Sequence, residues 1–111
     1  MTNGVEFTLD KPRRIKFTLA ELKALEQRLG KPMGDIVADM TRLSVITMQQ
    51  VLFAGLRATD NRLRFEDLER MLIDFVEGGK GTLNDVLYVL NEALMDSGYF
   101  GRAAGDKEAH D

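Results

Sequence analysis

Cysteine is absent from this chain of 111 residues, and its single histidine, His110, stands next to the last residue. Without cysteine the chain has no disulfide, no thiolate zinc site and no cysteine nucleophile. A histidine-based catalytic triad or metal site would depend on one side chain close to the C-terminus. We therefore expect no enzyme, no bound metal and no cofactor.

Long apolar runs are also absent. No stretch approaches the ~18 consecutive apolar residues of a membrane-spanning helix, and the first residues lack the basic and apolar regions of a signal peptide. These absences predict a soluble intracellular protein that has no membrane partner.

The net charge is small, −3, because the two halves of the chain carry net charges of opposite sign. Residues 1–57 carry nine Lys and Arg against six Asp and Glu, whereas residues 58–111 carry six against twelve. A general nucleic-acid-binding protein needs a dense basic face, so we expect no nucleic-acid partner. The split instead predicts two differently charged ends, which favours self-association from head to tail along an elongated client.

The N-terminal segment has the pattern of a small β-hairpin. Apolar and polar residues alternate over 5–9 and again over 14–18, which places the apolar side chains on one face. The four residues 10–13 between them include Pro12 and form the predicted turn. An isolated hairpin is marginally stable, so its apolar face must pack on the rest of the protein.

Five helical segments follow. Helical spacing of apolar residues predicts their positions at about 19–29, 33–42, 44–57, 65–77 and 83–97. Thr18 with Glu21, and Thr82 with Asp85, have the spacing of capping boxes at helix starts. The third helix is apolar over most of its surface, which is typical of a central helix, and its Ala54-Gly55 pair permits a close neighbour.

Together these patterns predict a mainly α fold. One domain covers residues 1–98, with five helices packed around the third and the hairpin alongside, and residues 99–111 form a flexible polar tail. In the first and third helices, the apolar stripes also include Leu19, Val45 and Ile46. The predicted core contains Leu22, Leu25, Leu29, Ile36, Val51, Leu52, Leu56, Leu68, Leu72, Leu87 and Leu90.

Two motifs that suggest chemistry have simpler explanations. The segment Gly79-Lys80-Gly81-Thr82 lacks the full spacing of a phosphate-binding loop and follows no strand, so we interpret it as an interhelical turn. The acidic residues of 66–77 occupy the solvated face of the fourth helix, where Arg70 can pair with Glu66 or Asp67.

Two surface clusters are candidates for partner binding. Arg13, Arg14 and Lys16 form a basic cluster, which either meets an acidic partner or protects an edge strand from mispairing.

The second cluster lies on and after the fifth helix. Tyr88 and Met95 are seven residues apart and fall off the core stripe of that helix, and Tyr99 and Phe100 follow it. Exposed aromatic and methionine side chains are typical of protein-binding patches. The alternative is that the hairpin or the second helix covers them.

Two segments carry a resemblance to a known family. Residues 15–30 join a basic strand to a capped helix of the form L-x-x-L-E-x-x-L-G, and a later helix ends in Ala54-Gly55-Leu56-Arg57. Over residues 4–95 the chain resembles the small tail assembly chaperones of phages, in particular the member encoded in the gene transfer agents of alphaproteobacteria. That family has also been labelled phage tail tube protein.

The resemblance implies a non-enzymatic protein of the bacterial cytoplasm. Such chaperones bind the tape-measure protein, keep it soluble, pass it to the tail tube protein, and are absent from the mature particle. Two other hypotheses remain: a structural tail component, such as a tube or connector subunit, and a regulatory helical module that binds a host protein. Under the chaperone hypothesis the partner-binding residues are Arg13, Arg14, Lys16, Tyr88, Met95, Tyr99 and Phe100.

Overall fold

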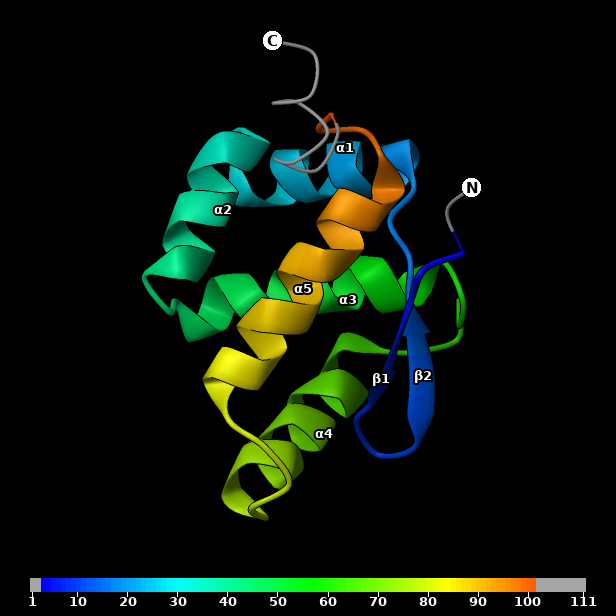
Figure 1. Cartoon of the computed structure of the whole chain (residues 1–111), viewed down its shortest axis with the longest axis vertical. Helices are drawn as coiled ribbons and strands as arrows, with labels where there is room; N and C mark the ends of the chain where they lie inside the picture. The colour runs from blue at the N-terminus through cyan, green and yellow to red at the C-terminus, as the bar shows by residue number, and fades with distance from the viewer. Residues whose placement is uncertain (1–2, 102–111) are drawn as a thin grey trace, which may run out of the picture.

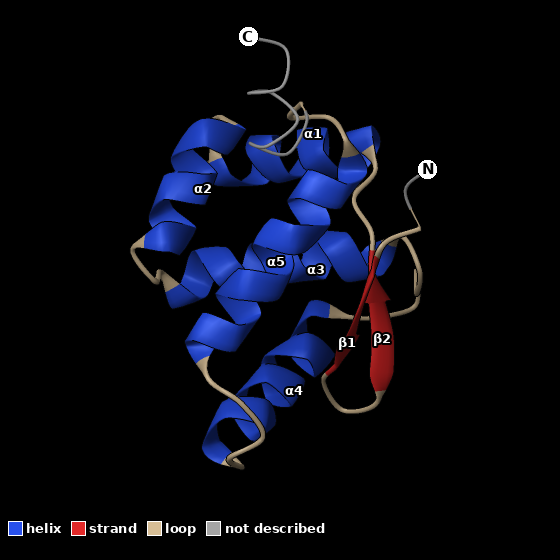
Figure 2. Cartoon of the chain, in the orientation of Figure 1, coloured by secondary structure: helices blue, strands red, loops and turns tan. Residues whose placement is uncertain are grey.

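The computed structural model of the chain describes residues 3–101; His110 and most of the predicted polar tail lie outside the described residues. The structure is mainly helical, with a two-stranded hairpin at its N-terminal end (Figure 2). Its elements are β1 (Val5–Thr8), β2 (Pro12–Ile15), α1 (Leu19–Leu29), α2 (Met33–Thr41), α3 (Val45–Arg57), α4 (Phe65–Glu77) and α5 (Leu83–Ser97). Within residues 3–101, none of these helices has the length and apolar character needed to cross a membrane.

The helices begin and end at residues whose side chains or backbone conformations favour a boundary. At the start of α1, the hydroxyl of Thr18 accepts a hydrogen bond from the Glu21 N–H at 3.2 Å. At the start of α5, Thr82 and Asp85 form both bonds of a capping box. Gly30 ends α1 with a φ of 69°, in the left-handed region that glycine adopts without steric cost. These local signals explain why the sequence places the helices correctly.

The third helix is central, as predicted. It contacts α1, α2, α4, α5 and β2, and α5 crosses in front of it in Figure 1. It approaches the hairpin closely at Gly55, whose carbonyl accepts a 2.9 Å hydrogen bond from the Lys16 N–H. The absence of a side chain at Gly55 leaves room for Ile15 and Phe17, which confirms the close neighbour expected at Ala54-Gly55.

The hairpin packs its apolar face against the helices. Its strands are antiparallel, with Val5 opposite Ile15 and Phe7 opposite Arg13. The ring of Phe7 lies 5.3 Å from that of Phe75 in α4, measured between centroids. The turn is shorter than predicted, because Pro12 and Arg13 belong to the second strand.

The buried core agrees with most of the predicted core. All of its predicted members are buried except Leu29 and Leu87, which are partly buried and pack against it. The burial predicted from the helical stripes was wrong at three other residues, since Leu19, Val45 and Ile46 are exposed. These three are the first residues of α1 and α3, so they lie at the ends of their helical stripes.

Candidate functional site

The described residues include the two motifs that suggested chemistry in the sequence. No group of three or more His, Asp or Glu side chains within 3–101 is arranged to hold a metal ion. At the turn before α5, the Thr82 N–H donates to the Asp85 carboxylate at 2.9 Å, and the Asp85 N–H donates to the Thr82 hydroxyl at 3.3 Å. These backbone donors are therefore used within the protein, which supports an interhelical turn and not a phosphate loop.

The acidic face of α4 forms surface ion pairs of the expected kind. Asp67 accepts from Arg70 at 2.8 Å and from Arg64 at 3.2 Å. The hydrogen bond from Arg64 is the largest cause that lowers the pKa of the Asp67 carboxyl below its ordinary value. These are solvated pairs of helical spacing, which contribute little to stability.

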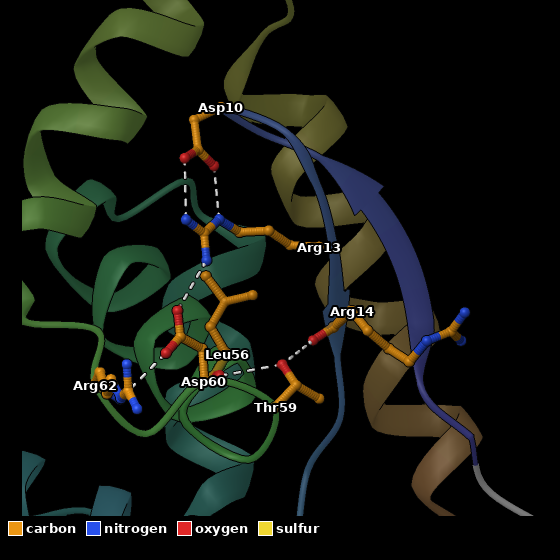
Figure 3. A network of polar contacts seen from close by, with 7 residues as sticks. All are labelled: Asp10, Arg13, Arg14, Leu56, Thr59, Asp60 and Arg62. Carbon is orange, nitrogen blue, oxygen red and sulfur yellow. Dashed lines mark hydrogen bonds and ion pairs between the residues drawn. The ribbon is translucent and has the colours of Figure 1, made fainter.

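The basic cluster of the hairpin is tied into the fold at Arg13. Figure 3 shows the Arg13 guanidinium between two carboxylates, with Nε 2.6 Å from Asp10 and Nη1 3.3 Å from Asp60. Only 9% of the Arg13 side chain is exposed. The hydrogen bond between them lowers the pKa of Asp10 and raises that of Arg13. Arg13 is therefore already paired with two carboxylates of its own chain, and its role as a partner contact stays a prediction.

The other two members of the basic cluster lie nearer the surface. The Arg14 side chain is exposed and donates to the carbonyls of Asn3 and Gly4 at 3.2 and 3.3 Å. The carbonyl of Arg14 accepts from the Thr59 hydroxyl at 2.8 Å (Figure 3), and Lys16 is partly exposed. These bonds attach β2 to β1 and to the loop after α3, so the cluster has a structural use.

The predicted separation of charge into two ends can be followed only within residues 3–101, because most of the predicted acidic tail lies outside them. The basic hairpin lies beside the acidic helix α4, and its second strand leads into α1 through residues 16–18 (Figure 1). Helix α1 itself carries two cations and two anions. Among these described elements charge alone does not define a head and a tail, and head-to-tail association stays a prediction.

The aromatic and methionine cluster on and after α5 is exposed. This decides between the two alternatives, an exposed cluster and one covered by the hairpin or by α2. Tyr88 is 67% exposed, and about half of the surface of Met95, Tyr99 and Phe100 is accessible. Neither the hairpin nor α2 covers them. Tyr88 and Met95 line the same shallow groove together with Val5 of β1, as their spacing predicted.

Two further grooves continue this surface across the ends of α1 and α2. Met95 and Phe100 line one of them with Met33 and Val37, and Phe100 and Tyr99 line the next with Leu19. Because neighbouring grooves share residues, they form one continuous apolar surface. We call it the α5 face, and its members are Val5, Leu19, Met33, Val37, Tyr88, Leu94, Met95, Tyr99 and Phe100.

The chain after α5 is held in place at the edge of this face. Gly98 has a φ of 79°, which reverses the chain direction. The Ser97 hydroxyl donates to the Leu94 carbonyl at 2.6 Å and accepts from the Tyr99 N–H at 3.3 Å. The turn therefore positions Tyr99 and Phe100 beside the C-terminal end of α5.

Two of the acidic side chains at the border of the α5 face are already engaged. The Asp96 carboxylate accepts from the Gly4 N–H at 3.0 Å, and that of Glu26 accepts from the Met33 N–H at 2.7 Å. Both bonds reduce the need of these carboxylates for an external partner. The face is thus suited to apolar contact more than to charged recognition.

A second apolar groove, which sequence reasoning missed, lies between α3 and α4. Its exposed members include Ile46, which is 74% exposed, and Ile73, which is 48% exposed. Val45 and Ile46 were assigned to the buried arc of α3, so no signal marked them as surface. We call this surface the α3–α4 groove; it is lined by Val45, Ile46, Gln49, Glu69, Leu72, Ile73, Val76, Glu77 and Leu83.

Comparison of the chain with protein families, with curated proteins and with solved structures finds no match.

Proposed function

We propose that this protein is a non-enzymatic assembly chaperone of phage-type tails, which binds an apolar helical segment of the tape-measure protein and aids tail tube assembly. The sequence resemblance over residues 4–95 supports the proposal. The small helical fold agrees with what that resemblance implies. In the bacterial cytoplasm the tape-measure and tail tube proteins would be its partners.

The α5 face is the observation that carries the proposal. It is a continuous surface on which three aromatic rings, a methionine and a leucine are each exposed by 44% or more. A monomeric protein rarely leaves such side chains together in water unless a partner covers them. Methionine adapts to varied partner shapes, and tyrosine buries its ring while its hydroxyl stays hydrated.

A chaperone needs a surface that binds its client and also releases it. The grooves of the α5 face are shallow and continuous, and no charged side chain within residues 3–101 is buried in them without a partner. Burial of apolar area on such a face gives affinity without fixed hydrogen bonds. This favours transient contact with successive apolar segments of a long client over permanent assembly.

Co-expression with the tape-measure protein of the same gene cluster tests the proposal. The wild-type chain should raise the soluble yield of that protein and copurify with it. A variant with Tyr88→Ser and Met95→Ser should lose both effects, because both residues are exposed and their truncation leaves the core intact. The control is Ile46→Ser, an equally exposed apolar residue outside the α5 face.

Three outcomes would overturn parts of the proposal. If the tape-measure protein is equally soluble alone and forms no complex, the chaperone function is wrong. If Ile46→Ser abolishes binding while the Tyr88 and Met95 changes do not, the client binds elsewhere than the α5 face. If mass spectrometry finds the protein in purified particles in stoichiometric amount, it is a structural tail component.

A further inference from the structure

The α3–α4 groove is separate from the α5 face, since the two surfaces share no residue. It has a volume of about 370 Å³ and runs between the first turns of α3 and the last turns of α4. Val45 and Ile46 form one wall, and Ile73 lies on the other. A groove between two helices with apolar walls has the shape that accepts a third helix.

Acidic side chains mark the α4 side of this groove. Glu69, Ile73 and Glu77 follow one another at intervals of four residues, so they form a row along one side of α4. The two carboxylates are about 12 Å apart along the helix axis, from eight residues at 1.5 Å each. Neither makes an ion pair with another side chain among residues 3–101, in contrast to Asp67 on the same helix.

We propose that the α3–α4 groove binds an amphipathic helix of another protein, one whose apolar face is flanked by Lys or Arg side chains about two turns apart. Apolar residues of that helix would cover Ile46 and Ile73. Its cations would lie against Glu69 and Glu77. The proposal concerns a different surface from the α5 face and does not depend on the chaperone function.

Charge decides between this occupant and a second copy of the chain. In a second copy of the chain, the helix that could enter the groove is α1. It exposes Leu19 and carries the cation Lys23 beside it. Glu26 lies on the same side of that helix, three residues after Lys23, and would meet the acidic row of α4. The repulsion between like charges makes α1 a poor match, whereas a helix with cations about two turns apart on the flank that faces α4 is complementary.

A synthetic peptide of about 18 residues, long enough to form a helix, is the probe. It carries leucines on one face and lysines on both flanks, and a second peptide has glutamate in place of every lysine. Binding of each labelled peptide to the full chain is followed by fluorescence anisotropy at low and high salt. The lysine peptide should bind at least about tenfold more tightly, because the glutamate peptide meets like charge.

Matched variants locate the binding on the protein. Ile46→Ser with Ile73→Ser should weaken the lysine peptide about tenfold or more, from the loss of buried apolar contact. Glu69→Gln with Glu77→Gln should weaken it about threefold to tenfold and remove most of its salt dependence. The controls are Leu19→Ser with Tyr88→Ser on the α5 face, and Glu66→Gln, an exposed acid of α4 outside the groove.

The controls should leave the affinity unchanged, with circular dichroism confirming that every variant is folded. Equal binding of the two peptides, or binding that the groove variants do not weaken, would overturn the proposal. Sedimentation of the chain alone covers the remaining case. Self-association that Ile46→Ser with Ile73→Ser abolishes would show that the occupant is a second copy, and would overturn it as well.

Discussion

Replacement of Gly55 by alanine tests the closest contact between α3 and the hairpin. In a Gly55→Ala variant the new Cβ atom would lie 2.5 Å from Ile15 Cγ2 and 3.1 Å from the Phe17 ring. A carbon atom cannot stay at the shorter distance, so the β2 segment must move away from α3. That movement lengthens the 2.9 Å hydrogen bond between the Lys16 N–H and the Gly55 carbonyl.

The expected change in stability follows from three opposing effects. Overpacking of a buried contact costs about 1–3 kcal/mol, and a weakened hydrogen bond costs about 0.5–1.5 kcal/mol. Alanine offsets part of this loss, because it is favoured over glycine within a helix by about 1 kcal/mol. We expect a net loss of about 1–3 kcal/mol in the free energy of unfolding, or roughly 4–8 °C in Tm for each kcal/mol.

Chemical denaturation followed by circular dichroism measures this loss. The matched control is Gly34→Ala in α2, where no atom lies within 4 Å of the new Cβ. This control should be neutral or stabilising by up to about 1 kcal/mol. In an Ile15→Ala background the cost of Gly55→Ala should shrink, because the clashing methyl group is gone. If Gly55→Ala proves as stable as Gly34→Ala, the close contact is not present in solution.

Two further predictions concern a pKa shift and a strained backbone. The hydrogen bond from Arg13 lowers the pKa of Asp10 below its ordinary value of 3.8. The contribution of the Asp10 carboxylate to stability is therefore complete above pH 3.8, and it is lost as the pH falls through the lower pKa of the folded state. Acid unfolding of the wild type should therefore depend on pH more steeply below about pH 4 than that of Asp10→Asn, and equal slopes would contradict the shift. Leu43 has a φ of 65° although it is not glycine, so Leu43→Gly should raise the free energy of unfolding by about 0.5–1 kcal/mol. A lower free energy of unfolding would mean instead that the leucine side chain packs against the fold.

The sequence predicts the elements well because their boundaries are decided locally. Thr18 and Thr82 each bond to a backbone N–H three residues ahead, and Gly98 reverses the chain within one residue. Such signals need no knowledge of the rest of the fold. The central place of α3 was also predictable, since a helix that is apolar on most sides must be surrounded.

The site at Arg13 was not predictable in the same way. One of its partners, Asp60, lies 47 residues away in the sequence and is brought near only when the hairpin packs beside the loop after α3. Arg14, next to it on β2, points to the opposite face and stays exposed. Sequence alone therefore identified the basic cluster but not which of its members the fold would use.

The errors in predicted burial fall on the two candidate binding surfaces. Leu19 belongs to the α5 face, and Val45 and Ile46 belong to the α3–α4 groove. The helical period shows which side of a helix is apolar, but another element must be present to cover that side. Where the apolar stripe continues past the neighbouring element, it does nothing for the isolated fold and favours association. Apolar stripe residues that no other element of the chain covers are thus the physical signal by which this sequence indicates its candidate binding surfaces.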